Sequence, residues 1–240
     1  MIRITAICLL LYASTLTMRA AFGAPTTQPV KVQIDDVSTL LSDLESIDPS
    51  TRDGAREQLM MLNASLLPQL RETVEKLDSI SIAQSLALKD IVIHIRATGE
   101  HNFDGEGTSL IGVTQSGEPD APCVIESRRI GFDAYRVLRD GDQIVQVALV
   151  DPRDGAIVRA RAIEWFTQMQ DWMRGVPVGS WIQVSVIRNG AQLSLQLRTA
   201  PNPDRRNGDL TPNYDAWVNE ALDYWTREFE PVVSERSKRR

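Results

Sequence analysis

The sequence predicts an α+β protein with a helical part first, a β-rich part second and one helix last. Between about residues 36 and 98 the apolar residues recur at the spacing of amphipathic helices. Over residues 108–199 they alternate instead, and Asn189-Gly190 joins two alternating runs as in a tight β-hairpin. An apolar stripe over residues 213–229, rich in aromatic side chains, returns to helical spacing.

The first 23 residues have the pattern of a signal peptide. Arg3 precedes the apolar run 4–18, and small residues lead to Gly23. The run is shorter than the roughly 20 residues that span a bilayer. We therefore expect export to the periplasm or cell envelope, with residues 24–35 as a flexible leader. An uncleaved anchor is the alternative, and only then do we expect contact with a membrane.

The charge balance argues against nucleic acid as a partner. The chain has 26 basic and 32 acidic residues, a net charge of −6. Removal of residues 1–23 takes away Arg3 and Arg19 but no acid, which leaves 24 basic residues against 32 acidic ones, or −8. Such a chain lacks the basic surface that displaces phosphate counterions. Cys123 is the only cysteine beyond residue 23, so no disulfide within the exported chain is expected, and its apolar neighbours indicate a buried thiol.

Four helices with short connections are expected over residues 36–98. Asp48-Pro49 is a typical helix start, because aspartate caps free amides and proline fits the first turn. The string 48–72 has this start, an Ala-x-x-x-Leu row and a Leu-Pro-x-Leu second helix, and it resembles a HEAT-type repeat. The resemblance implies a small HEAT-like helical bundle that serves for docking.

The β-rich part is expected to form a small, partly open barrel with one inserted helix at 161–175. The expected strands are 110–115, 123–128, 143–150, 181–188 and 191–198. Residues 200–240 should then comprise a linker, an amphipathic helix at 213–229 and a basic tail. Asn213 is the candidate N-cap of that helix, and Pro231 is expected to follow its end.

Three motifs in the β-rich part carry a family resemblance. They are Leu-Ile-Gly-Val at 110–113, Gly-Asp-x-Ile-x-x-Val at 141–147, and Val-Ile-Arg-Asn-Gly at 186–190. In this order and spacing, residues 108–199 resemble a bacterial PDZ domain of the type found in exported proteases and their relatives. The chain departs from that family in the segment before Gly141 and in the longer segment 148–161, so the loops around the groove are less well defined.

The stretch Asp140-Gly141-Asp142 has two interpretations. Paired aspartates occur in metal sites and in carboxylate dyads, but either needs further ligands or a positioned partner. The neighbouring residues Arg136, Arg139 and Gln143 supply none. We expect a turn, with a positive φ at Gly141 and an aspartate that accepts local backbone N–H groups.

The PDZ resemblance implies a groove that takes a peptide as an added strand and binds its terminal carboxylate with loop amides. The inserted helix would form the other wall. Of its two apolar stripes, we expect 165/169/172 to face the groove and Ile163, Phe166 and Met173 to face the core; the alternative is that both are core. The candidate peptide-binding residues are Leu110, Ile111, Gly112, Val113, Thr114, Trp165, Met169 and Trp172.

No catalytic apparatus is expected. His94 and His101 are the only histidines, and neither belongs to a recognisable triad or zinc motif. We also expect no cofactor and no metal. The sequence therefore predicts an exported, non-catalytic adaptor that binds the C-terminus or an extended segment of another protein. The alternatives are a structural module whose groove is filled by its own chain, either helix 213–229 or the leader segment 25–32, and a regulatory partner of an envelope protease.

Overall fold

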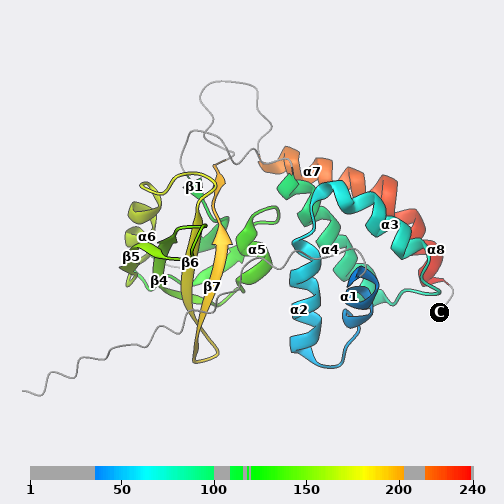
Figure 1. Cartoon of the computed structure of the whole chain (residues 1–240), viewed down its shortest axis with the longest axis horizontal. Coiled ribbons are helices and arrows are strands. Elements are labelled where there is room, and N and C mark those ends of the chain that lie inside the picture. The colour runs from blue at the N-terminus through cyan, green and yellow to red at the C-terminus, as the bar shows by residue number, and fades with distance from the viewer. Residues whose placement is uncertain (1–35, 100–108, 116–117, 119, 203–213, 239–240) are drawn as a thin grey trace, which may run out of the picture. The chain divides into compact units, whose positions relative to one another are not determined.

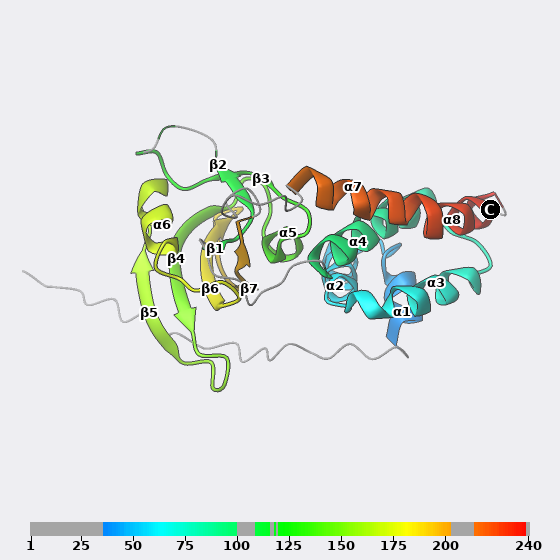
Figure 2. The same cartoon turned by 90° about the horizontal axis from the view of Figure 1, so that it is seen from above.

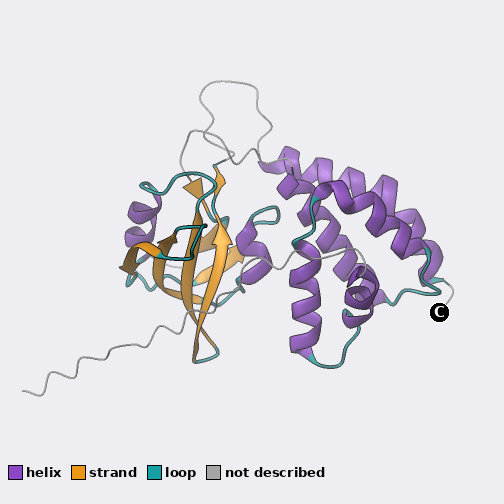
Figure 3. Ribbon diagram, viewed as in Figure 1, coloured by secondary structure: helices purple, strands orange, loops and turns teal. Residues whose placement is uncertain are grey.

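The structure is a computed structural model that describes residues 36–99, 109–115, 118, 120–202 and 214–238. These residues form helices and open sheets, which confirms the α+β class (Figures 1 and 3). The expected signal peptide, the leader, the linker at 100–108 and the Asn213 cap lie outside the described residues.

The four expected N-terminal helices are present. Asp48 caps the second of them, accepting from the Ser50 and Thr51 amides with Pro49 at the first turn, as predicted. The helical spacing of apolar residues over 37–47 predicts a first helix of that length, but the helix ends at Asp43, and Ile47 beyond its end is 96% exposed. No helix among the described residues is both long and apolar enough to cross a membrane. The helices are α1 (Val37–Asp43), α2 (Pro49–Met60), α3 (Leu67–Glu75), which follows the 3-10 turn η2 (Ala64–Leu66), and α4 (Ile82–Gly99).

The C-terminal helix completes the core of the helical part. Helix α7 (Tyr214–Tyr224) runs beside α4 in both views (Figures 1 and 2). The buried side chains of Ala221, Trp225, Phe229 and Val233 join the same hydrophobic core as Leu59 and Leu88. The predicted apolar stripe therefore packs against the helical part.

The prediction that Pro231 follows the end of this helix is wrong. A π-helical turn, η4 (Trp225–Phe229), leads into α8 (Glu230–Ser237), with Pro231 in the first turn of α8. Proline has no N–H to donate to the carbonyl four residues before it, and its ring crowds that carbonyl. The wider π turn just before Pro231 lets the chain continue as a helix.

Three open sheets replace the expected partly open barrel, and the described strands form no closed barrel. The largest sheet has the order β5-β4-β6-β7. Strands β4 (Gln143–Val150), β6 (Trp181–Arg188) and β7 (Ala191–Arg198) match the predicted ranges. Asn189 and Gly190 have φ values of 51° and 79°, which confirms the tight hairpin between β6 and β7.

Strand β5 (Ile157–Ala162) is absent from the sequence prediction, which gives a loop followed by a helix from residue 161. All six residues of β5 are exposed, so no buried face marks it as a strand. It pairs with β4 and forms an edge of the sheet (Figure 2). The inserted helix, α6 (Phe166–Met173), is correspondingly shorter than expected.

The expected strand 110–115 is interrupted at residues 111–112. Strand β1 (Ser109–Leu110) pairs with β8 (Ala200–Pro201), whereas β2 (Val113–Gln115) pairs with β3 (Ile125–Arg128). Gly112 lies at the break with a φ of 75°, a conformation that glycine adopts without strain. The Leu-Ile-Gly-Val segment is therefore a bend that joins two small sheets.

A second unpredicted element, the helix α5 (Asp133–Val137), connects the β-rich part to the helices. The Tyr135 hydroxyl donates to Asp90 of α4 at 2.8 Å. The Arg136 guanidinium donates to Asp133 and to Glu57 of α2, both at 2.8 Å. Residues 133–137 thus contact two helices of the other part through hydrogen bonds and ion pairs.

Candidate functional site

A groove of about 460 Å³ lies between the Leu-Ile-Gly-Val segment and helix α6. The helix contributes an apolar wall from Phe166, Met169 and Met173. Ser109 fixes the end of this helix beside the bend, because its hydroxyl donates to the Met173 carbonyl at 3.2 Å. The residues that line the groove are Ser109, Leu110, Ile111, Gly112, Val113, Arg129, Phe166, Met169, Gln170, Met173, Arg174 and Asn202.

Five of the eight candidate residues line this groove: Leu110, Ile111, Gly112, Val113 and Met169. Thr114 does not; its hydroxyl contacts the Ser127 hydroxyl at 2.6 Å on the neighbouring strand.

The prediction of which apolar stripe of α6 faces the groove is wrong. Phe166 and Met173, expected in the core, line the groove, whereas Trp165 and Trp172 do not. Trp165 precedes α6 in an extended conformation, with φ −129° and ψ 152°, so helical spacing does not apply to it. Trp172 is buried, and its ring lies under the Arg159 guanidinium of β5 with Cζ 4.9 Å from the ring centroid.

The bend leaves two backbone donors next to the groove without a partner among the described residues. The Arg129 amide donates to the Gly112 carbonyl at 2.7 Å, which places Gly112 opposite Arg129 in the ladder with β3. Because backbone groups alternate along an antiparallel strand, the amide and carbonyl of Val113 point away from β3. The amides of Ile111 and Gly112 donate no hydrogen bond to any residue that the structure describes. The edge of β2 therefore offers main-chain groups to a bound chain.

The side chain of Phe132 packs against the bend at Gly112 and fixes its shape. A Cβ atom added to Gly112 would overlap Cβ and Cγ of Phe132, whose side chain is buried. Phe132 precedes α5 and also packs on Tyr214 of α7, with the ring centroids 6.1 Å apart. Gly112 is thus required both for its positive φ and for the close approach of this ring.

The Asp140-Gly141-Asp142 stretch lies outside the groove and forms a turn, as predicted. Gly141 has a φ of 88°. Asp142 accepts the Arg139 amide at 2.8 Å and both Nε and Nη2 of Arg188 at 2.8 Å, and it is 1% exposed. Asp140 pairs with Arg128 at 2.7 Å at the surface. Asp142 therefore connects this turn to the end of β6.

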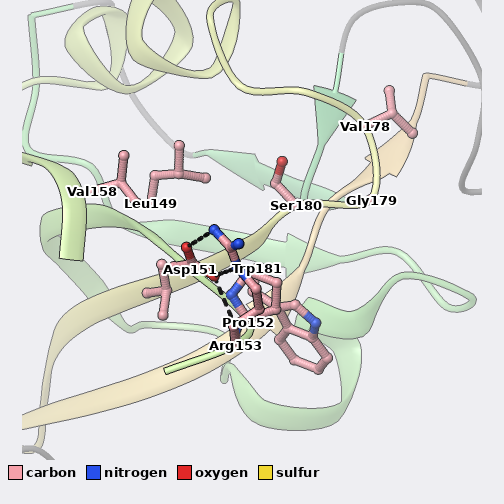
Figure 4. A pocket seen from close by; sticks show the side chains of 10 residues that line it. Leu149, Asp151, Pro152, Arg153, Val158, Val178, Gly179, Ser180 and Trp181 are labelled. Carbon is pink, nitrogen blue, oxygen red and sulfur yellow. Dashed lines mark hydrogen bonds and ion pairs between the residues drawn. The ribbon is translucent and has the colours of Figure 1, made fainter. Parts of the chain in front are cut away.

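A second hollow, of about 470 Å³, lies beside the turn between β4 and β5 (Figure 4). Its charged members, Asp151 and Arg153, bond to each other in a two-point ion pair. The hydrogen bonds from Arg153 lower the pKa of Asp151 to about 2, so its carboxylate does not act as a proton donor near neutral pH. The hollow has apolar walls from Leu149, Val158 and Trp181.

Neither hollow holds a cluster of metal-ligating side chains. In the part of the chain that the structure describes, no three His, Cys, Asp or Glu residues lie together in a metal-binding arrangement. His94 is buried, and its Nδ1 accepts the Gly131 amide at 3.2 Å. His101 lies outside the described residues.

Cys123 is buried beneath α6, with Sγ 3.7 Å from Sδ of Met169. Burial raises the pKa of its thiol from 9.0 to about 11. The thiolate fraction near pH 8 is then about a hundredfold lower than in the unfolded chain. In a Cys8→Ser variant, we expect Ellman's reagent to label the folded protein at least about a hundredfold more slowly than the denatured protein.

The same pKa shift predicts a pH dependence of folding. A raised thiol pKa favours the folded state below pH 9, and this contribution is lost between pH 9 and 11 as the unfolded chain ionises first. In the labelling experiment with Ellman's reagent, equal rates for the folded and the denatured protein would show that Cys123 is accessible.

No protein-family model matches the chain, and no curated protein sequence matches it.

Proposed function

We propose that the protein is a non-catalytic adaptor that binds the C-terminus of a partner protein in the groove between β2 and α6. One observation carries the proposal: the groove joins a strand edge with free main-chain donors to an apolar helix wall. An extended peptide can add to such an edge, with an alternate side chain on the apolar wall. The resemblance of residues 108–199 to PDZ domains supports the same use.

The charges at the rim favour a free carboxylate as the terminal group. Arg129 and Arg174 both line the groove. The Ile111 and Gly112 amides lie in consecutive positions at a bend, an arrangement suited to anions. A peptide that ends in an apolar residue would place its side chain against Met169 and Met173 and its carboxylate at the bend. The unbranched methionines can adapt to side chains of different shape.

Expected affinities are moderate. About four main-chain hydrogen bonds at ~1 kcal/mol each and one apolar anchor at ~1.5–3 kcal/mol are offset by the cost of ordering the peptide. The complex should have a Kd in the micromolar range or weaker. This strength suits recruitment of a partner that later dissociates, and the predicted export places such a partner in the cell envelope.

A peptide with a free apolar C-terminus is expected to bind about tenfold more tightly than the same peptide with a C-terminal amide, because one charge-assisted hydrogen bond is lost. Fluorescence anisotropy with labelled peptides of both kinds measures the ratio. Equal affinities would exclude carboxylate recognition. Absence of binding to a varied set of apolar C-termini would contradict the adaptor function.

Occupation of the groove by the C-terminal helix, the structural alternative, has no support from residues 214–238. Ala221, Trp225, Phe229 and Val233 belong to the core of the helical part, and no residue of 214–238 lines the groove. Tyr214, at the start of α7, contacts Phe132 and Arg129 beside the groove.

A further inference from the structure

We propose that the open edge of strand β5 is a second docking surface, which binds an extended protein segment that has acidic residues at alternate positions. Strand β5 pairs with β4 on one side, and no described strand pairs with its other side (Figure 2). None of its residues lines the groove between β2 and α6. This surface is therefore separate from the groove, and its use does not depend on the proposed function.

The backbone of β5 offers unused hydrogen-bonding groups at this edge. The Ile163 amide donates to the Val145 carbonyl at 2.9 Å, so these two residues face each other as a hydrogen-bonded pair at the end of the ladder with β4. Such pairs alternate with non-bonded pairs along an antiparallel ladder. Ala160 and Ala162 are in non-bonded pairs, so their amides and carbonyls point away from β4. Outside the ladder, these groups form no hydrogen bond with any residue that the structure describes.

Two arginines give the same edge an uncompensated positive charge. Arg159 and Arg161 are two positions apart, so their side chains lie on the same face of the strand. The Arg159 guanidinium packs on the Trp172 ring, 4.9 Å from its centroid, and its Nη2 lies 3.4 Å from the Trp172 and Gly175 carbonyls, so all of these partners are neutral. Arg161 is exposed and forms no hydrogen bond or ion pair with any residue in the described ranges.

These charges indicate which segment fits the edge. Paired residues of antiparallel strands share a face, so a second copy of β5 in the registers of greatest overlap would place Arg159 opposite Arg159 or Arg161. Like charges directly opposite each other destabilise a strand pair, whereas opposite charges stabilise it. The arginines thus protect the edge from pairing with itself. A segment with glutamate or aspartate at every second position would instead place its carboxylates on the face of both arginines.

Hydrogen exchange of the full chain, followed by NMR, tests where such a segment binds. The probe is a short peptide in which glutamate and threonine alternate, acetylated and amidated at its ends so that it has no terminal carboxylate. At a peptide concentration about ten times Kd, exchange of the Ala160 and Ala162 amides should slow about tenfold, because only about a tenth of the protein is then free. The Arg159 and Arg161 amides already bond to β4 and should change little. A peptide with lysine in place of glutamate should protect none of them.

Substitutions separate the contribution of charge from that of the backbone. Arg161→Gln should weaken binding of the glutamate peptide about threefold and Arg161→Glu about tenfold. Arg153→Gln is the matched control, because Arg153 is an exposed arginine just before β5 that already pairs with Asp151; it should change the affinity less than about twofold. Ala160→Pro removes the outward N–H without removing a bond to β4 and should abolish binding, whereas Ala160→Val keeps the N–H and should retain it.

Three results would overturn the inference. If the glutamate peptide protects neither Ala160 nor Ala162, the arginines only guard the edge. If Arg161→Glu binds the peptide as well as the wild-type protein does, charge does not select the segment. If a peptide with a free apolar C-terminus displaces the glutamate peptide, both occupy the groove between β2 and α6. Thermal melts identify any variant that fails to fold, and Arg161→Glu, which changes only an exposed side chain, keeps the test valid if Ala160→Pro unfolds.

Discussion

Substitution of Gly112 by alanine is expected to destabilise the fold by about 3 kcal/mol and to abolish peptide binding. The positive φ at this position costs a non-glycine residue about 1–2 kcal/mol. Overlap of the new Cβ with the Phe132 ring adds a further cost of about 1–3 kcal/mol, because the ring is buried and cannot move away freely. Urea denaturation measures the loss of stability, and fluorescence anisotropy with labelled peptides measures the loss of binding.

Gly141→Ala is the matched control for this substitution. Gly141 also has a positive φ, 88°, but a Cβ there would meet no atom within 4 Å. Gly141→Ala should therefore lower stability only by the cost of a positive φ in a non-glycine residue, about 1 kcal/mol, and leave peptide binding intact. Similar losses for Gly112→Ala and Gly141→Ala would show that Phe132 does not constrain the bend. A Phe132→Ala change added to Gly112→Ala should recover part of the clash energy, a deviation from additivity.

The second large effect is expected at Asp142. Its carboxylate is 1% exposed and accepts two hydrogen bonds from Arg188 and one from the Arg139 amide. Asp142→Ala leaves the Arg188 guanidinium without its carboxylate partner in a half-buried site and the Arg139 amide without its acceptor. We expect a loss of about 3 kcal/mol in the free energy of unfolding.

Asp140→Ala, two residues away in the same turn, is the control. The Asp140 side chain is 54% exposed, and its ion pair with Arg128 is at the surface, so the cost should remain below about 1 kcal/mol. Chemical denaturation of the two variants under identical conditions compares the two carboxylates directly. Equal stabilities would show that burial does not distinguish the roles of Asp140 and Asp142.

The accuracy of the sequence prediction depended on whether each element buries one face. Strands β4, β6 and β7 were predicted to the residue, since alternating apolar side chains and a two-residue Asn-Gly turn define them. Strand β5 has no buried face, and the residues that alternate with its arginines are only small alanines, so it left little signal. The helix α6 stripe was misassigned because α6 begins at Phe166, five residues later than the prediction.

The residues of the candidate site were likewise predicted only in part. Residues 110–113 were predicted as groove residues from their motif, although the bend there was not, and Met169 was predicted from helical spacing. Phe132, Arg129 and Tyr214 were missed, because the contacts of Tyr214 with the other two depend on how α7 packs. Local periodicity contains no information on contacts between residues more than 80 positions apart. A positive φ was expected only at Gly141; the positive φ of Gly112 and its close contact with Phe132 required coordinates.

The hydrogen bonds around α5 have a practical consequence for anyone who divides this chain into fragments. A fragment limited to residues 108–202 would lose the Asp90 acceptor of Tyr135, the Glu57 carboxylate of Arg136 and the His94 acceptor of the Gly131 amide. The Tyr214 ring beside Arg129 would be lost with them. Ligand screens that use such an excised fragment would sample a damaged recognition surface, so negative results from them would say little about the intact protein.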